Sequence, residues 1–226
     1  MQTGDGMAPR RKFDRATLPP RPDLSFERTL WEAGLHRVVG VDEAGRGALA
    51  GPVAAGAVVL PWDFPGLYNR LVGVRDSKLM KAESRELWAE AIKDTAVAWG
   101  VGLASAGEID RMGILPATHL AIERALDSVA CKPEHILVDY LRLPGDPTPQ
   151  TALVKGDARS LSIASAAILA KTARDALMRE MDRAYPGYGF ARHKGYATWR
   201  HRQAIEAHGP CEQHRRTFAP VAAKLI

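Results

Sequence analysis

The chain has 226 residues, of which 46% are hydrophobic, which is enough for one sizeable core but short for two ordinary domains. Its formal net charge of +5 is a moderate basic excess that suits a polyanionic partner without requiring one. Two distant cysteines offer neither a disulfide framework nor a zinc knuckle, and no apolar run reaches the length of a membrane span, so we expect a cytoplasmic protein with no membrane partner and, by default, a monomer.

The first 22 residues are rich in Gly, Pro and Arg and show no apolar periodicity. Such a segment cannot bury enough surface to offset the entropy lost on ordering it. We therefore predict a flexible basic tail over residues 1–22 and one folded domain over residues 23–226. The last part of that domain, from about residue 185, should be a C-terminal helical region.

After the tail, apolar periodicity predicts helices and strands. Residues 24–33 have the spacing of a short amphipathic helix that stops at Gly34. Residues 36–41 and 52–60 are apolar and rich in β-branched side chains, so two strands should flank the segment between them. Further on we predict, in chain order, a helix over 83–92, a strand over 96–104, a helix over 115–130, a strand over 136–140 and a helix over 162–185.

This order of elements predicts an α/β fold in which a mixed central sheet is flanked by helices. One face of the helix over 115–130 should be buried, and it would carry Leu115, His119, Leu120, Ile122, Ala125 and Leu126. Residues 187–216 are basic, contain glycines and aromatics, and are expected to be less regular.

Two adjacent acids, Asp42 and Glu43, follow the first predicted strand and precede the turn Gly45-Arg46-Gly47. Adjacent carboxylates repel each other and are costly to bury without a positive partner. A divalent cation such as Mg2+ or Mn2+ would supply that partner, because hard cations prefer carboxylate oxygens. Since neighbours in a strand point to opposite faces, both acids could reach one ion only if the strand ends or bulges here.

Other interpretations of this segment are open. Two solvated loop acids would have the same sequence. The glycines at 45, 47 and 51 could form a degenerate dinucleotide-binding turn, but two carboxylates would then face the pyrophosphate and Pro52 is a poor start for the helix that should follow. A P-loop is excluded because no Gly-Lys-Ser/Thr follows.

Metal-assisted phosphodiester chemistry with two ions needs three or four carboxylates from different elements. Asp139 ends the predicted strand over 136–140, and Asp157 precedes the Ala-rich helix. Each could instead be an ordinary strand-end or helix-start acid. Whether they meet the acid pair depends on the fold.

Six ordered motifs across residues 24–220 resemble those of the ribonuclease HII family: Val41-Asp-Glu-Ala-Gly-Arg-Gly47, Arg75-Asp-Ser-Lys78, Lys155-Gly-Asp157, Ala170-Lys171, Tyr185-Pro-Gly-Tyr-Gly-Phe190 and His193-Lys-Gly-Tyr196. The resemblance implies a ribonuclease H-like catalytic domain. It implies an endonuclease that hydrolyses the RNA strand of RNA-DNA hybrids and cuts 5' of single ribonucleotides embedded in duplex DNA, as in ribonucleotide excision repair. The products would carry 5'-phosphate and 3'-hydroxyl ends.

The resemblance also implies roles for individual residues. The turn Gly45, Arg46 and Gly47 would contact the ribonucleotide 2'-hydroxyl, since glycine permits close backbone approach and this hydroxyl distinguishes RNA from DNA. Tyr196 would stack on the sugar just 3' of the ribonucleotide. The catalytic residues, which would also be the ligands of Mn2+ or Mg2+, are Asp42, Glu43, Asp139 and Asp157.

Phosphate contacts are expected near the junction and on a basic face, and no small-molecule cofactor is implied. The residues near the junction are Ser77, Lys78, Ser160, Lys171 and Lys194. The basic face would be formed by Arg192, Lys194, Arg200, Arg202, Arg215 and Arg216.

Two positions depart from the family pattern. Tyr140 stands where a glycine usually follows the acid at 139, and Leu79 stands where a second lysine is frequent. The first could alter how Asp139 is presented, and the second removes a possible phosphate contact. A hybrid-binding protein without catalysis is the main alternative function, and the presence of all four acids argues against it.

Overall fold

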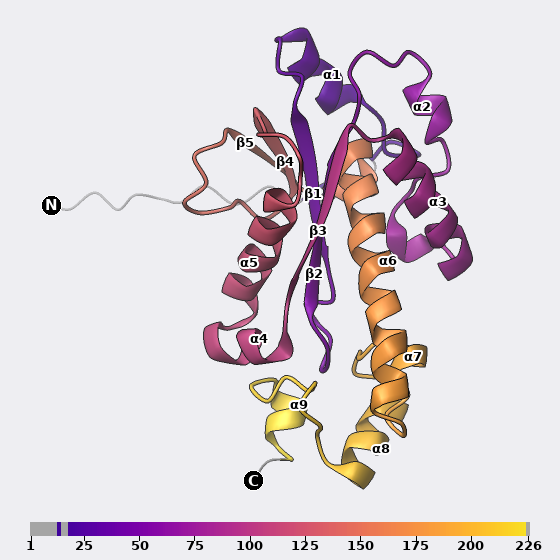
Figure 1. Cartoon of the computed structure of the whole chain (residues 1–226), viewed down its shortest axis with the longest axis vertical. Helices are drawn as coiled ribbons and strands as arrows, with labels where there is room; N and C mark the ends of the chain where they lie inside the picture. The colour runs from indigo at the N-terminus through magenta and orange to yellow at the C-terminus, as the bar shows by residue number, and fades with distance from the viewer. Residues whose placement is uncertain (1–12, 15–17, 225–226) are drawn as a thin grey trace, which may run out of the picture.

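The computed structural model describes residues 13–14 and 18–224. Its centre is a five-stranded sheet with the strand order β3-β2-β1-β4-β5 (Figure 1). The strands are β1 (Val38–Ala44), β2 (Val53–Val59), β3 (Ala98–Ala104), β4 (His135–Asp139) and β5 (Gln150–Leu153).

The sheet is mixed, as predicted. β2 pairs antiparallel with both β1 and β3, whereas β4 pairs parallel with both β1 and β5. Because β1 and β4 are parallel neighbours, their carboxyl ends lie at the same edge of the sheet. Val41 is the register partner of Val138, so Asp42 and Asp139 follow these partners on adjacent strands.

Helices cover both faces of the sheet (Figure 1). α4 (Ala106–Met112) and α5 (Ile114–Asp127) pack on one face, and α3 (Ala82–Thr95) and α6 (Leu161–Ala184) lie on the other. The remaining helical segments are α1 (Ser25–Glu32), α2 (Leu67–Arg70), the 3-10 turns η2 (Ser77–Leu79) and η3 (Gly156–Ala158), and the C-terminal α7 (Phe190–His193), α8 (Trp199–His208) and α9 (Ala219–Ala222). These last three confirm the predicted C-terminal helical region.

α6 approaches the sheet closely because two glycines face it. A Cβ on Gly40 of β1 would lie 2.3 Å from the backbone of Ser162, and one on Gly56 of β2 would lie 2.3 Å from the carbonyl oxygen of Ala166. No larger side chain fits at these contacts. The close packing fixes the N-terminal half of α6 against the two strands that carry and flank the acid pair.

Several predicted boundaries are wrong in instructive ways. β1 runs through the acid pair to Ala44 instead of ending before it, because Asp42 and Glu43 pair regularly with Gly56 and Ala55 of β2. The structure also adds α4 and β5, which apolar periodicity does not predict. β5 has only four residues, of which three are partly exposed.

α5 buries only part of the predicted face: Ile122 and Ala125 are buried, and Leu120 and Leu126 pack partly buried against the core. Its buried residues are Ala117, Thr118, Ala121, Ile122 and Ala125, whereas Leu115 is 42% exposed. Small residues line the buried face because the helix lies close to Gly100 and Gly102 of β3. Of the leucines on the predicted face, Leu115 alone lies on the exposed side of this helix.

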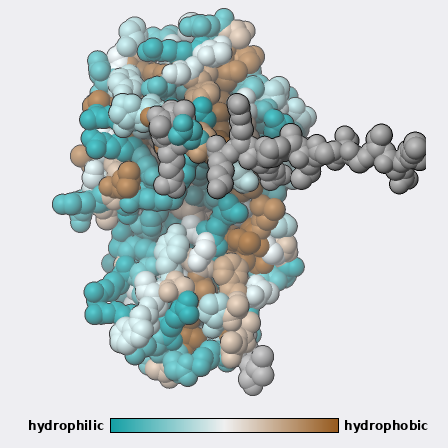
Figure 2. All heavy atoms as spheres, turned by 180° about the vertical axis from the view of Figure 1, so that it is seen from behind, coloured by the Kyte–Doolittle hydropathy of each residue, from teal (hydrophilic) through white to brown (hydrophobic). Residues whose placement is uncertain are grey.

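The predicted flexible tail over residues 1–22 lies largely outside the described residues. In its described part, the Arg21 guanidinium donates to the Val72 carbonyl, and residues 18–22 line a cavity together with Arg75 and Leu79. None of the helices in the described part of the chain is both long enough and apolar enough to cross a bilayer. On the face shown in Figure 2, hydrophilic side chains predominate and hydrophobic ones form small separate groups.

Candidate active site

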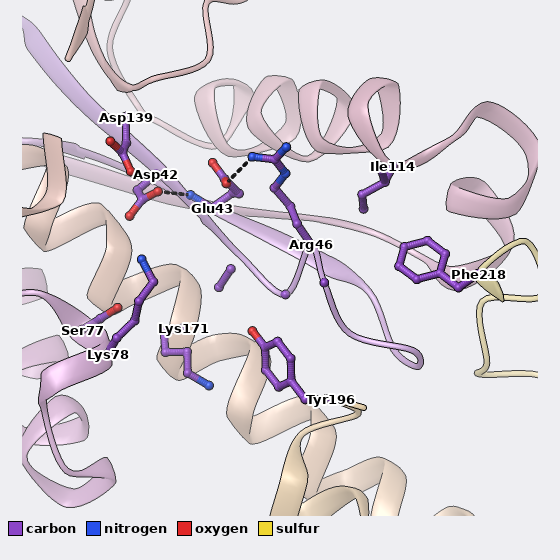
Figure 3. A pocket seen from close by; sticks show the side chains of 13 residues that line it. Asp42, Glu43, Arg46, Ser77, Lys78, Ile114, Asp139, Lys171, Tyr196 and Phe218 are labelled. Atoms are coloured by element: carbon purple, nitrogen blue, oxygen red, sulfur yellow. Dashed lines mark hydrogen bonds and ion pairs between the residues drawn. The ribbon is translucent and has the colours of Figure 1, made fainter. Parts of the chain in front are cut away.

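Three aspartates from three separate segments meet at the edge of the sheet. Asp42 lies in β1, Asp139 ends β4, and Asp157 lies in η3 just before α6. One carboxylate oxygen from each lies within 4.8 Å of the others. Figure 3 shows Asp42 and Asp139 side by side, with the Lys78 amine pointing toward them.

Backbone and lysine donors hold these carboxylates in place. The amide of Gly156 donates to Asp139 Oδ1 at 2.8 Å, and the amide of Glu43 donates to Asp42 Oδ1 at 2.7 Å. Lys78 Nζ lies 3.2 Å from Asp157 Oδ2. Asp42 and Asp157 are 5% and 2% exposed, so two of the three acids are almost out of contact with solvent.

The pKa values of the acids reflect this crowding. Burial and the neighbouring charges of Glu43, Asp139 and Asp157 raise the pKa of Asp42 well above its ordinary value. Burial is also the main reason that the pKa of Asp139 rises to about 6, while the hydrogen bond from Gly156 opposes the rise. Burial lowers the pKa of Lys78, but the charges of Asp157 and Asp42 outweigh it, so the net shift is upward.

The cluster fits a divalent cation. Three mutually repelling oxygen ligands of hard character, two of them buried, are the donor set that Mg2+ or Mn2+ prefers. A bound cation would relieve the repulsion that raises the carboxyl pKa values. The site therefore has the chemistry of a metal centre.

Glu43 stands apart from this group in the structure. It is the neighbour of Asp42 in a regular strand, and adjacent strand residues point to opposite faces. Its Oε1 lies 3.2 Å from the guanidinium of Arg46, and Figure 3 shows this pair on the side away from Lys78. The bulge that would bring both acids to one ion is not present.

The turn after β1 is held by a buried arginine from the C-terminal region. Arg215 is 0% exposed and donates to the carbonyls of Gly45 (2.8 Å), Arg46 (2.8 Å) and Gly51 (3.0 Å). Gly45 has a φ of +91°, which disfavours any residue with a Cβ. Gly47 is exposed, and a Cβ placed there would meet nothing within 4 Å, so a ligand could approach its backbone closely.

A second buried arginine supports Tyr196. Arg174 of α6 donates to the carbonyls of Pro52, Ala50 and Lys194, and its guanidinium carbon lies 5.5 Å from the centre of the Tyr196 ring. Tyr196 is 37% exposed. It lines the same cavity of about 490 Å³ as Asp42, Asp139 and the turn, together with Ile114 and Phe218.

Two of the expected phosphate-binding residues line this cavity beside Lys78, namely Ser77 and Lys171. Asp175 pairs with both Lys171 and Arg85. Burial lowers the pKa of Lys171, and the contact with Asp175 opposes this change. Lys171 is thus held at the cavity wall by a buried acid.

Three expected phosphate contacts are placed differently. Ser160 is 0% exposed; its hydroxyl donates to Glu27 at 2.6 Å and caps the start of α6, so the expectation that it binds phosphate is wrong in this structure. Arg215 is likewise buried and cannot belong to a basic surface. Lys194 does not line the cavity, and its amine donates to the carbonyl of Ala191.

The sequence did not reveal Arg174 and Asp175 as site residues, and it placed Arg215 on a basic face instead of at the turn. Arg174 had a usable signal: with Ala167, Ala170 and Met178 it falls on one helical face of α6, and these positions are buried. Arg215 had none, because its partners are backbone carbonyls about 165 to 170 residues away.

Comparison with known proteins agrees with this geometry. A family model for ribonuclease HII matches residues 39–221. The ribonuclease HII of Thermus thermophilus is 53% identical over 197 residues, which cover 87% of this chain and 93% of that protein. That of Myxococcus xanthus is 53% identical over 203 residues, which cover 89% of this chain and 68% of that protein.

Solved structures share the fold. Ribonuclease H2 from Pyrococcus horikoshii superposes with a TM-score of 0.67 at 28% identity, covering 82% of this chain and 95% of that one. Bst ribonuclease HIII, solved in complex with Mn2+, superposes with a TM-score of 0.61 at 23% identity, covering 83% of this chain and 68% of that one. The chain has the ribonuclease H-like fold and belongs to the ribonuclease HII family, whose members are metal-dependent endonucleases that cleave the RNA of RNA-DNA hybrids.

Proposed function

We propose that this protein also cuts on the 5' side of single ribonucleotides embedded in duplex DNA, leaving 5'-phosphate and 3'-hydroxyl ends. The observation that carries the proposal is the shared cavity. Asp42 and Asp139 line it next to the Gly45-Arg46-Gly47 turn and Tyr196. Groups suited to phosphodiester hydrolysis and groups suited to reading one sugar therefore face the same space.

Asp42, Asp139 and Asp157 are the proposed ligands of Mg2+ or Mn2+, with Glu43, which pairs with Arg46 here, as the fourth. The chemistry that a bound divalent cation supplies is stabilisation of the charge that builds on the scissile phosphate and the departing 3'-oxygen. The protein's own contribution is to hold the carboxylates in place through the amides of Glu43 and Gly156 and the amine of Lys78. Fixed ligands avoid reorganisation during the reaction.

The choice of RNA is proposed to lie in the turn and in Tyr196. The exposed backbone at Gly47 can approach a minor groove, and backbone groups there can bond the 2'-hydroxyl that only RNA carries. The Tyr196 ring, partly exposed and backed by Arg174, can pack on the next sugar. A deoxyribose at that position has no 2'-hydroxyl, so it can pack directly against the ring.

Backbone phosphates would be bound by the cations that remain accessible. Lys78 and Lys171 line the cavity with Ser77, and Lys194 is kept as a proposed contact beyond it. The exposed arginines of the C-terminal region are Arg192, Arg200, Arg202 and Arg216. Contacts of this kind position the duplex without reading its sequence, and they weaken as salt rises.

The wider setting is proposed on the same basis. We propose a monomeric, cytoplasmic protein of ribonucleotide excision repair, with a catalytic domain over residues 23–226. Its substrates would be RNA-DNA hybrids and ribonucleotide-containing duplexes, with no small-molecule cofactor.

The test is the product formed from a labelled duplex that contains one ribonucleotide. With Mg2+ or Mn2+ we expect a single cut 5' of the ribonucleotide, a 3'-hydroxyl on the upstream fragment and a 5'-phosphate on the downstream one, and no cut after chelation by EDTA. A cut on the other side of the ribonucleotide, or a 2',3'-cyclic phosphate end, would overturn the proposal.

A further inference from the structure

Three buried imidazoles form a cluster next to the backbone of residues 194–196. His193 ends α7, His201 lies in α8, and His214 lies between α8 and α9; they are 9%, 0% and 1% exposed. The rings of His193 and His201 stack with their centres 4.3 Å apart, and His201 Nε2 lies 3.1 Å from His214 Nε2. The function proposed above does not use these rings.

Backbone groups at the two ends of the His201-His214 pair fix where the protons lie. At one end the Cys211 amide, which can only donate, meets His214 Nδ1 at 3.0 Å. At the other end the Tyr196 carbonyl, which can only accept, meets His201 Nδ1 at 2.9 Å. His214 Nδ1 is therefore an acceptor and His201 Nδ1 a donor.

The contact between the two rings then has one direction. Since His214 Nδ1 carries no hydrogen, His214 Nε2 carries it and donates to the bare Nε2 of His201. The result is an ordered chain of hydrogen bonds from the Cys211 amide through both neutral rings to the Tyr196 carbonyl. The Cys211 thiol, 3.2 Å from His214 Nδ1, can donate its S–H to the same nitrogen, which is consistent with this order.

His193 is fixed in the same way. Its Nε2 donates to the Tyr188 carbonyl at 2.8 Å, and its Nδ1 accepts from the Gly195 amide at 3.2 Å. All three rings are thus neutral, each with one defined tautomer. A proton added to His201 would place two N–H groups against each other between the two rings, and one added to His214 would set an Nδ1–H against the Cys211 amide.

Burial of the pair outweighs the backbone hydrogen bonds that raise the pKa of both rings. The titratable groups that face His201 and His214 are each other, His193, Cys211 and, through its ring, Tyr188, while Asp182 and Lys194 act on His193. Phe190 packs against all three imidazoles. Burial lowers the pKa of His201 and of His214 to about 4.

The hydrogen-bond chain ends at the Tyr196 carbonyl. The carbonyls of the two preceding residues also accept hydrogen bonds. Arg174 donates to the Lys194 carbonyl at 2.9 Å, the Leu49 amide donates to that of Gly195 at 2.8 Å, and the Thr198 amide shares that of Tyr196 with His201. We propose that His201 and His214 are positioning residues for Tyr196, whose ring they set at the sugar next to the ribonucleotide through this ordered hydrogen-bond chain. The proposal rests on the proposed function in assigning that role to Tyr196.

The first arm of the test is nitrogen NMR of the imidazoles in the whole protein, without metal or nucleic acid. We expect His201 protonated at Nδ1 and His214 at Nε2, with both signals unchanged from about pH 8 to about pH 5.5. The opposite tautomer in either ring, or titration near the ordinary pKa of 6.5, would overturn the hydrogen-bond order and the proposal with it.

The second arm uses His201→Phe, which keeps an aromatic ring against Phe190 but removes both nitrogen functions. The Tyr196 ring and amide signals should shift, and the ratio of the cleavage rate at a single ribonucleotide to that on a long hybrid should fall by about tenfold, the scale of one buried hydrogen bond. The matched control is His208→Phe in the same helix, an exposed ring that meets only the edge of Tyr188 among the described ring contacts. It should leave both readouts unchanged.

A conservative variant separates positioning from general loss of structure. His214→Gln keeps an N–H at the Nε2 position, so it should retain the Tyr196 signals and most of the ratio even if His201→Phe folds poorly. The proposal is contradicted if His201→Phe has the same ratio of single-ribonucleotide to hybrid cleavage as His208→Phe. It is also contradicted if this ratio falls as far in His214→Gln as in His201→Phe. A wild-type protein that cuts neither substrate would instead refute the proposed function, and the NMR arm would still decide the order of the chain.

Discussion

The charge of Asp42 lowers the stability of the metal-free fold but is needed for the proposed cleavage reaction. Burial and three neighbouring carboxylates raise its pKa, which means that its charge costs folding free energy when no cation is present. Asp42→Asn should therefore stabilise the metal-free protein by at least about 1 kcal/mol. It should also reduce cleavage by more than about a hundredfold while binding to a hybrid stays measurable, because a proposed metal ligand is lost whereas the phosphate contacts remain.

Thermal unfolding in EDTA, a binding titration and a cleavage assay on the same preparation measure these effects. Asp76→Asn is a matched control, since Asp76 caps η2 near the site but is not part of the aspartate cluster. Full activity in Asp42→Asn would remove this residue from the proposed ligands.

Tyr140 shows a second tension at the residue scale. It follows Asp139 with a φ of +65°, a left-handed conformation that is strained for an aromatic residue, and its ring is 65% exposed. Because little packing is lost, Tyr140→Gly should raise the free energy of unfolding by roughly 1 kcal/mol. Urea unfolding measures the change. Asparagine tolerates this conformation, so the free energy of unfolding of Tyr140→Asn should lie between those of the wild type and Tyr140→Gly. If Tyr140→Gly instead lowered the free energy of unfolding by a similar amount, the Tyr140 ring would have to pack against the domain.

At the scale of elements, the turn after β1 depends on a residue from the other end of the chain. Arg215→Met should destabilise the protein by roughly 3 kcal/mol, because three buried carbonyls lose their donor. It should also weaken the preference for a ribonucleotide over a deoxyribonucleotide, since the turn loosens. Arg216→Met is the matched control: this side chain is exposed, and the variant should unfold at the wild-type urea concentration. Equal effects of the two substitutions would be incompatible with a clamp by Arg215.

The strands and long helices were predictable from sequence because each carries an apolar run or an apolar period long enough to stand out. β2 and the first ten residues of α6 are buried at every position, so these two were marked by continuous apolar or Ala-rich runs. β5 is too short to show a period, and α4 is marked only by its capping box of Ser105 and Glu108, a signal that could have revealed it.

The site was predictable where its residues are neighbours in sequence or follow a family motif, as for the acid pair and its turn. Glu43 points away from Asp42 because both lie in one regular strand. The sequence-based prediction ended that strand before the acid pair and so missed this orientation. The burial of Ser160 under Glu27 depends on how α1 packs over the start of α6, and no local pattern encodes that contact.

At the scale of the whole molecule, the buried histidines give stability a defined pH dependence. His201 and His214 have folded pKa values of about 4 against an ordinary 6.5, so the unfolded chain binds more protons between these values. Their contribution is complete above about pH 6.5 and is lost as the pH falls toward 4. From pH 7.5 to pH 5 the two rings should together remove about 2 to 4 kcal/mol of unfolding free energy.

Urea unfolding across that pH range tests this point. The raised carboxyl pKa values of Asp42 and Asp139 act in the opposite direction, so the comparison with His201→Phe isolates the imidazoles. That variant should show a flatter profile than the wild type, whereas His208→Phe should keep the wild-type slope. Parallel profiles for all three proteins would mean that these rings titrate alike in the folded and unfolded states.

The central claim is that one cavity both recognises a 2'-hydroxyl and holds the carboxylates that cut beside it. The most direct measurement is the single-turnover cleavage rate on two duplexes that are identical except for one 2'-hydroxyl, with Mg2+ and saturating protein. The account predicts a cut at the ribonucleotide and no detectable cut in the all-DNA duplex, with discrimination reduced in Tyr196→Ala. Equal rates on the two duplexes, or no cleavage of either, would contradict it.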